Sequence, residues 1–166
     1  SSDVCSSDLL YYSIYAKDEC VLGLNCSHDY EEGLKMAKAE HKPILLDFTG
    51  YACVNCRRME ENVWSQDDVY RVLKDSFIVI SLYVDDKKQL PAAQQFSYTT
   101  KEGIEKDIIT VGDKWSTFET ENFSNNSQPL YALLNTDEVL LARPVGYTPS
   151  AKEYLEWLRC GLQAAK

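Results

Sequence analysis

The sequence predicts a single α/β domain in which helices cover a central sheet. Three observations support this class. The 166 residues are enough to bury one hydrophobic core without help from metals or disulfides. Short apolar runs, typical of buried strands, alternate with segments of helical periodicity. Hydrophobic residues make up 45% of the chain and charged residues 26%, a balance typical of folded globular domains.

The charge balance excludes several classes of partner. There are 26 acidic and 17 basic residues, which give a formal net charge of −9. Such a chain is repelled by nucleic acid and by anionic membrane surfaces, so neither is expected as the main partner. The longest apolar run, residues 77–84, is much shorter than the ~20 residues that a membrane helix needs. We therefore expect this segment not to span a membrane.

Residues 1–28 are expected to form an irregular lead-in before the domain. Residues 3–8 resemble the peptide encoded by a common sequencing-library adapter, so we treat residues 1–9 as an assembly artefact and not as a signal peptide. On that interpretation the natural chain begins further upstream. Cys20 and Cys26, in the rest of the lead-in, either form a local disulfide or remain unpaired.

The first two elements of the domain are a helix and a buried strand. Asp29 is placed to cap the helix, and Glu32 follows three residues later, as in a capping box. The helix ends before Pro43. Residues 44–48 are a short apolar run between Pro43 and Gly50, which favours a buried strand.

A second, amphipathic helix is expected to follow Cys53. The residues at core-facing spacing are Cys56, Met59 and Val63. The charged residues expected on its outer face are Arg57, Arg58, Glu60 and Glu61.

The middle of the chain predicts a helix, a strand and an inserted hairpin. Residues 65–68 have the pattern of a second capping box, which opens a helix. Residues 77–84 form the strongest predicted strand. The polar segment 88–112 is longer than a simple connection, and its residues 96–100 and 104–111 predict a surface hairpin.

The last third of the chain predicts two helices and two strands. Residues 114–123 are expected to be helical, and residues 130–134 and 139–142 are expected to be strands joined by a turn. A C-terminal helix starts near Ser150. Its apolar stripe consists of Tyr154, Leu155, Leu158 and Leu162.

The Cys-x-x-Cys motif at 53–56 carries the candidate chemistry. Cys53 lies at the start of the second helix, where unpaired backbone N–H groups and the helix dipole stabilise a thiolate. Cys56 lies one turn later and faces the core, which keeps its thiol protonated. At this spacing the two sulfur atoms can bond with little movement. The motif therefore predicts that Cys53 attacks a disulfide and that Cys56 resolves the mixed disulfide.

Two further residues are candidates for supporting roles. Asp47 lies six residues before Cys53 inside an apolar strand. If it is buried, its pKa is raised and it can take the proton of Cys56 during resolution; a structural acceptor or a solvated strand end is an equally good interpretation. Pro129 marks a strand start or a cis turn. In the functional interpretation it is cis, lies beside the cysteines and leaves a backbone edge free to pair with a substrate chain.

These motifs resemble the thioredoxin superfamily. The more specific resemblance is to the C-terminal thioredoxin-like domain of bacterial transmembrane thiol:disulfide interchange proteins of the DsbD type. It rests on residues 44–64, 80–86, 110–115 and 126–129. It implies a thioredoxin-like fold over residues 29–166, with a central mixed sheet flanked by helices and an inserted hairpin-like segment at about 88–112.

The resemblance also implies a function and a location. Cys53 would be the attacking thiol, Cys56 the resolving thiol, Asp47 the buried acid and Pro129 the cis-proline, with the redox-active disulfide in place of any cofactor. The domain would be a protein-disulfide reductase on the periplasmic side of a bacterial inner membrane. It would receive electrons from a membrane-embedded part of the same or a partner protein and reduce periplasmic disulfide-bearing proteins, with a link to cytochrome c biogenesis. Val54-Asn55 departs from the Gly-Pro of thioredoxin itself, which bears on the redox potential.

Two alternatives remain beside disulfide exchange. The first is a thioredoxin-fold binding or chaperone module without redox turnover, in which Cys53 is inert. The second is a zinc site in which Cys20, Cys26 and His28 join the two cysteines of the motif. We disfavour zinc because the spacing is not that of a zinc ribbon, and we assign no metal ligands. His41 and Cys160 are likewise assigned no chemistry.

Overall fold

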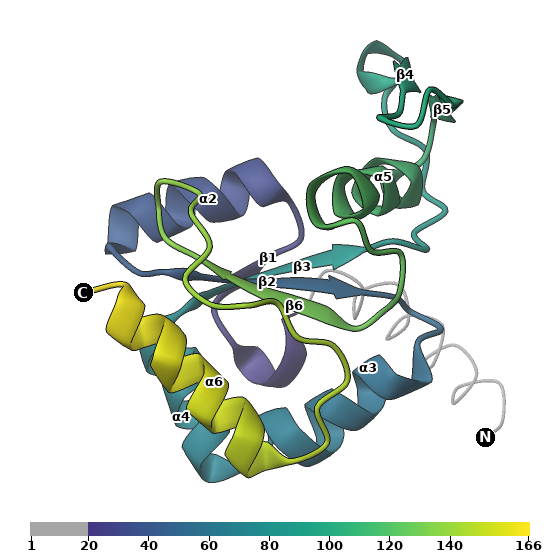
Figure 1. The fold of residues 1–166 in the computed structure, drawn as a ribbon. Coiled ribbons are helices and arrows are strands. Elements are labelled where there is room, and N and C mark those ends of the chain that lie inside the picture. Colours follow the sequence, from purple (N-terminus) through teal and green to yellow (C-terminus); the bar gives the residue numbers. More distant parts are fainter. Residues whose placement is uncertain (1–19) are drawn as a thin grey trace, which may run out of the picture.

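In the computed structural model, which describes residues 20–166, a four-stranded mixed sheet lies between two layers of helices (Figure 1). This confirms the expected α/β class. The strand order is β1 (Cys26–Ser27), β3 (Ile78–Tyr83), β2 (Ile44–Thr49) and β6 (Leu130–Leu134). β3 runs parallel to both β1 and β2, and β6 runs antiparallel to β2. The edge strand β1 was not expected from the sequence.

The helices cover both faces of this sheet (Figure 1). One face carries α2 (Tyr30–Glu40) and α5 (Val111–Phe123). The other carries α3 (Val54–Met59), the π-helical turn η2 (Glu60–Trp64), α4 (Asp67–Ser76) and α6 (Ala151–Ala164). The remaining short helical turns are η1 (Val21–Gly23) and η3 (Ala92–Gln94).

The strands divide their side chains between two hydrophobic cores. In β2, Ile44, Leu46 and Phe48 pack on the α2–α5 side, whereas Leu45 packs on the α4–α6 side. Since side chains of a strand alternate between faces, Asp47 must lie on the same face as Leu45, which is the face that α3 covers. The sheet thus places the candidate acid beneath the candidate cysteines.

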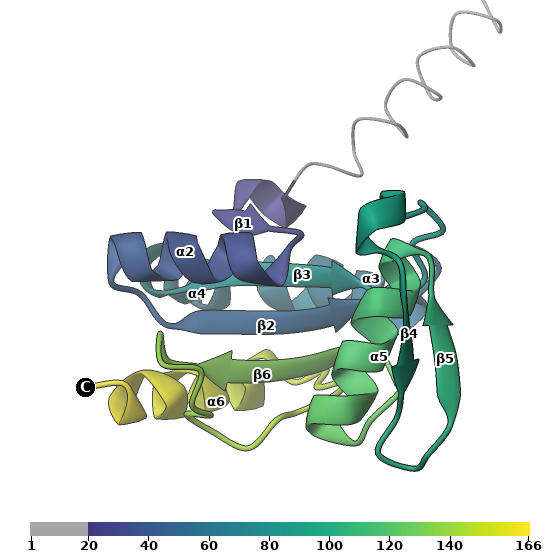
Figure 2. The ribbon, with the colours of Figure 1, turned by 90° about the horizontal axis from the view of Figure 1, so that it is seen from above.

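Several local predictions are confirmed. Asp29 caps α2 and accepts a hydrogen bond from the N–H of Glu32 at 3.0 Å. The inserted segment forms the hairpin β4 (Phe96–Thr99) and β5 (Glu105–Ile108), a separate two-stranded sheet that lies beside α5 (Figure 2). The predicted C-terminal helix is α6, capped by Ser150.

The capping box predicted at residues 65–68 is wrong. Gln66 is the N-cap of α4 and makes no capping hydrogen bond with its side chain. Ser65 keeps a helical backbone at the end of η2, and its hydroxyl donates to the carbonyl of Glu61 instead. The preceding helix thus extends through the position where the sequence suggested a new start.

Two other boundaries also differ from the prediction. Residues 139–142 form no strand and contribute only an isolated bridge between Leu140 and Leu134. Leu141 and Ala142 pack against the core on the α4–α6 side, whereas Val139 and Leu140 are exposed, so the apolar side chains do not alternate as they do in a half-buried strand. α5 begins at Val111 and not near residue 114, because Thr110 and Asp113 form a reciprocal capping box.

Residues 1–19, which contain the segment interpreted as adapter-derived, lie outside the described residues. In the rest of the chain no helix combines the length and the apolar character that crossing a bilayer requires.

Candidate active site

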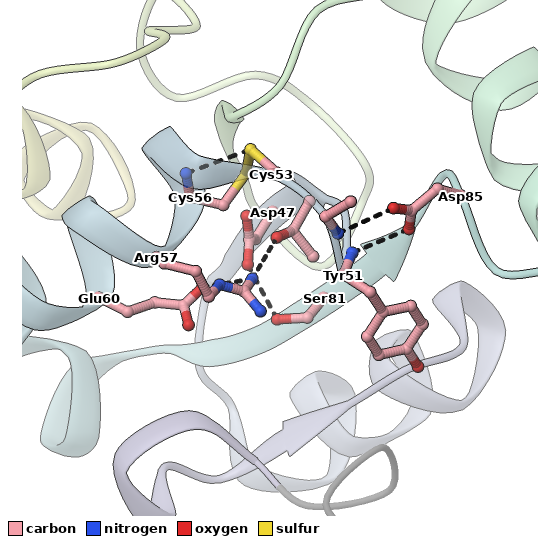
Figure 3. A network of polar contacts seen from close by, with 10 residues as sticks. Asp47, Tyr51, Cys53, Cys56, Arg57, Glu60, Ser81 and Asp85 are labelled. Atoms are coloured by element: carbon pink, nitrogen blue, oxygen red, sulfur yellow. Dashed lines mark hydrogen bonds and ion pairs between the residues drawn. A yellow bond between two sulfur atoms is a disulfide. The ribbon is translucent and has the colours of Figure 1, made fainter. Parts of the chain in front are cut away.

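The two cysteines of the motif form a disulfide at the start of α3 (Figure 3). Cys53 is the N-cap of α3, and its Sγ accepts a hydrogen bond from the N–H of Cys56 at 3.1 Å. Cys53 is partly exposed, whereas Cys56 is only 1% exposed. An accessible sulfur therefore lies at the positive end of a helix, and its partner is enclosed by the core.

The turn that presents Cys53 is fixed by Asp85, a residue that the sequence analysis did not single out. The Asp85 carboxylate accepts hydrogen bonds from the N–H groups of Tyr51 at 2.8 Å and of Ala52 at 3.1 Å (Figure 3). The Tyr51 ring also stacks on that of Tyr83, with 4.0 Å between centroids. Asp85 follows β3 just as this turn follows β2. Because the two strands are parallel neighbours, their C-terminal ends lie side by side. The sequence feature that could have identified Asp85 is its position directly after the strongest predicted strand, residues 77–84.

Asp47 is buried on the sheet face below α3 (Figure 3). It is 3% exposed, and Ser81 on the neighbouring strand donates its hydroxyl hydrogen to Asp47 Oδ2 at 3.0 Å. Burial raises the pKa of Asp47 to about 7, and the nearby Glu60 carboxylate adds to the rise. The Ser81 hydrogen bond and the Arg57 charge act in the opposite direction. A solvated strand end is thereby excluded, and the group can exchange a proton near neutral pH.

Arg57 and Glu60 do not lie on a solvated outer face as expected. Arg57 Nη2 donates to Glu60 Oε2 at 2.8 Å and to Thr49 Oγ1 at 3.1 Å, and both side chains are at most half-exposed. Burial raises the pKa of Glu60, while its contact with Arg57 lowers it. Two buried acids need a compensating cation, and Arg57 is drawn inward to supply it. An acid one helical turn after Cys56 was the signal that the sequence analysis missed.

Pro129 lies at the end of β2 that leads to the cysteines. The Gln128–Pro129 peptide bond is cis, as expected. Leu130 pairs with Phe48, so the antiparallel register puts Pro129 beside the last residue of β2. Gln128 is held by a buried acid on α5: its Nε2 donates to Glu119 Oε1 at 2.8 Å.

Glu119 is itself unusual because it is 0% exposed. Burial raises its pKa to about 7, and the hydrogen bond from Gln128 opposes this rise. Its second oxygen, Oε2, has no hydrogen-bond partner among the described residues. The residue before Pro129 is therefore anchored to a carboxyl group that titrates near neutral pH.

The zinc site considered for all five residues is not assembled. Cys53 is bonded to Cys56, and Cys20 is bonded to Cys26 in a second disulfide, one of the two states left open for that pair. Among residues 20–166, Cys160 is the free cysteine, and it is exposed.

Three features define a domain of the thioredoxin-like class. They are a mixed sheet covered on both faces, a Cys-x-x-Cys pair at a helix start, and a cis-proline beside the strand end that leads to the cysteines. The family model of the thioredoxin-like domain matches residues 30–161. The chain belongs to this family.

Solved structures of similar fold include an oxidoreductase, a thioredoxin and a DsbD C-terminal domain. The chain is 18% identical to a DsbH oxidoreductase, with a TM-score of 0.58, over 84% of this chain and 85% of that one. It is 20% identical to a thioredoxin from Thermus thermophilus, with a TM-score of 0.56, over 82% and 85%. It is 17% identical to the DsbD C-terminal domain of Neisseria meningitidis in its reduced form, with a TM-score of 0.50, over 78% and 90%. At these identities the likeness shows the fold alone. No curated protein matches the chain.

Proposed function

We propose that this domain reduces disulfide bonds of partner proteins by thiol–disulfide exchange through Cys53 and Cys56. The observation that carries the proposal is the Cys53–Cys56 disulfide at the start of α3, with Cys53 accessible and the buried Asp47 on the face beneath. This pairing separates an attacking sulfur from a resolving one.

The chemistry proceeds in two exchanges. In the reduced domain, the Cys53 thiolate attacks one sulfur of a partner disulfide, forms a mixed disulfide and releases the other sulfur as a thiolate, which takes a proton from water. Asp47 then accepts the proton of Cys56, and the Cys56 thiolate attacks Cys53 Sγ. The second partner sulfur leaves as a thiolate and takes up the proton that Asp47 releases. Two electrons have passed to the partner, and the domain carries the Cys53–Cys56 disulfide.

The surface around Cys53 supports docking of an extended protein segment. Val54 is 63% exposed beside Cys53, and the exposed Tyr147 follows Gly146, which lies against the carbonyl of Pro129. The outer edge of β6 is paired with Val145 from Tyr131 onward. The stretch just before it, at Pro129, is the part of this edge at which a partner backbone would pair.

The partners and the location follow from the DsbD-type resemblance. We propose that the domain lies on the periplasmic side of a bacterial inner membrane and acts on periplasmic disulfide-bearing proteins, including those of cytochrome c biogenesis. A membrane-embedded donor domain returns two electrons to the Cys53–Cys56 disulfide after each turnover. No cofactor is needed, because the disulfide itself carries the electrons.

Two cysteine variants test the exchange reaction. Cys53→Ser should abolish disulfide reduction, whereas Cys56→Ser should accumulate mixed disulfides with partners, detectable by non-reducing electrophoresis and mass spectrometry. Full activity in Cys53→Ser would rule out the proposal and favour a binding or chaperone module. Equilibration in graded dithiol–disulfide buffers measures the direction of electron flow. A potential near the thioredoxin value of about −270 mV supports a reductase, and one near about −120 mV indicates an oxidase.

A further inference from the structure

A second group of sulfur and nitrogen ligands lies at the opposite edge of the sheet from β6. Cys20 and Cys26 flank the short turn η1, and His28 follows the edge strand β1. One potential ligand atom from each of the three residues lies within 4.8 Å of the other two. This group of three comes from a segment of only nine residues, 20–28, and is separate from the Cys53–Cys56 pair.

The orientation of His28 is fixed by the neighbouring strand β3. Its Nδ1 lies 3.2 Å from the backbone carbonyl oxygen of Ser81. A carbonyl only accepts hydrogen bonds, so Nδ1 must carry the hydrogen, and Nε2 of the neutral ring must carry a free lone pair. Nε2 is buried and has no hydrogen-bond partner among the described residues. The ring also packs against Tyr83, with 5.5 Å between centroids.

This arrangement is the one that metal-binding histidines adopt. Such a histidine donates one ring N–H to a backbone carbonyl, which fixes the tautomer and aims the other nitrogen at the metal. A buried ring nitrogen without a partner is otherwise unfavourable. Two thiolates and an imidazole suit zinc better than magnesium or calcium, which prefer oxygen ligands.

We propose that Cys20, Cys26 and His28 form a zinc site that opens when the Cys20–Cys26 disulfide is reduced. A dithiol reductant supplies two electrons and two protons, becomes a disulfide and leaves two thiols on the domain. Zinc then binds both sulfurs and His28 Nε2 and displaces the two thiol protons. A disulfide oxidant can then take two electrons from the two thiolates, which re-forms the Cys20–Cys26 bond, leaves the oxidant as a dithiol and releases the metal. A fourth position remains for water or an incoming ligand.

The movement required is small. Ligand atoms of a tetrahedral zinc site lie roughly 3.6–3.8 Å apart, given Zn–S and Zn–N distances of about 2.3 and 2.1 Å. The two sulfurs and one ring nitrogen of His28 already lie within 4.8 Å of one another, and the sulfurs, which are bonded in the disulfide, must move apart after reduction. His28 is held by Ser81 and Tyr83, so the sulfurs adjust to it. Cys20, in the lead-in before η1, is the side chain best placed to do so.

The test measures zinc binding in a Cys53→Ser/Cys56→Ser background. This background removes the other dithiol, so the result does not depend on the proposed exchange reaction. After reduction with a phosphine and removal of oxygen, we expect one zinc per chain. Cobalt(II) should give the intense near-ultraviolet absorption of thiolate ligation, and zinc should protect Cys20 and Cys26 from alkylation. The oxidised form should bind no zinc at this site.

Single substitutions then separate ligation from folding. His28→Asn keeps a donor for the Ser81 carbonyl but lacks Nε2. It should weaken zinc binding by at least roughly 10–100-fold, because loss of a ligand costs at least as much as loss of its supporting partner. His41→Asn is the matched control: His41 is exposed and has a left-handed backbone that asparagine accepts, so binding should be unchanged. Cys20→Ser provides a second variant should His28→Asn fold poorly. The site would be refuted by absence of zinc from the reduced background, or by His28→Asn and Cys20→Ser variants that bind zinc as tightly as that background does.

Discussion

At the scale of single residues, burial, the Glu60 carboxylate and the Arg57 charge together set the pKa of Asp47. Asp47 and Glu60 both lie near Arg57. Burial raises the pKa of each carboxyl group, and the Arg57 charge lowers the pKa of each. The Arg57 charge stays paired with Glu60 at 2.8 Å. Asp47 instead has a neutral partner, Ser81. Asp47 is therefore the acid of the two that is better able to hold or lose a proton near pH 7.

The first prediction concerns Asp47→Asn. If Asp47 accepts the proton of Cys56, the variant should slow resolution of mixed disulfides by on the order of 100-fold, with little effect on the first attack by Cys53. Acid-quenched time courses that resolve the mixed disulfide by mass spectrometry measure both steps. Equal slowing of the two steps would argue against the proton-acceptor role.

Ser81→Ala is the matched variant for this test. It keeps the carboxylate but removes the hydrogen bond that lowers the pKa of Asp47. If resolution needs ionised Asp47, the pH midpoint of this step should move upward from about 7, while the rate at high pH should persist. An unchanged midpoint would indicate that Asp47 does not govern the step.

At the scale of elements, α5 is docked closely on the segment that supports the cysteine turn. The N–H of Gly112, in the first turn of α5, donates to the carbonyl of Asp86 at 2.8 Å. A Cβ at this glycine would lie 2.7 Å from the carbonyl oxygen of Val84 and 2.8 Å from that of Asp86. Asp85, between these two residues, accepts the N–H groups of the turn before Cys53. The position of α5 is thus linked mechanically to the disulfide.

Gly112→Ala tests this link. Since backbone atoms cannot move aside as a side-chain tip can, the added methyl group should destabilise the domain by about 1–3 kcal/mol and displace Asp85. Disulfide exchange should therefore slow even below the unfolding temperature. Thr120→Ala, at an exposed position of the same helix, is the control and should leave the exchange rate unchanged. Normal exchange by a destabilised Gly112→Ala protein would show that α5 does not support the turn.

At the scale of the whole molecule, two buried acids make stability depend on pH. Asp47 lies on the α3 face of the sheet and Glu119 belongs to α5 on the other face, and the pKa of each is raised to about 7 from ordinary values of 3.8 and 4.5. Between about pH 4 and pH 7 the two carboxyl groups of the folded protein keep protons that the unfolded chain has lost. The stabilisation is fully present below about pH 4 and is lost as the pH rises through 7.

The free energy of unfolding of the oxidised protein should therefore fall between about pH 4.5 and pH 7 and level off above it. Each acid contributes up to a few kcal/mol, at about 1.4 kcal/mol per pKa unit. Urea titrations across this range measure the slope. Glu119→Gln should reduce the slope, whereas Glu156→Gln, at an exposed position of α6, should leave it unchanged. Stability that rises with pH over this window would contradict the assignment.

The amino-acid sequence by itself determined the elements that depend on near neighbours. Asp29 caps α2 because its partner is three residues away, and β2 is buried because its six residues are mostly apolar. The placement of Cys53 at a helix start and the burial of Cys56 follow from one strand end and one helical period. Most of the candidate active site could therefore be predicted from residues 44–59.

Only the tertiary structure decided what joins distant segments. Asp85 reaches the cysteine turn because two parallel strands end together, and Arg57 turns inward because two acids are buried near it. Ser81 on β3 bonds both Asp47 on β2 and His28, which follows β1. Periodicity shows which face a residue occupies, but not which strand lies beside it. These contacts depend on strand order and on the cost of burying charge, and both arise only when the whole sheet has formed.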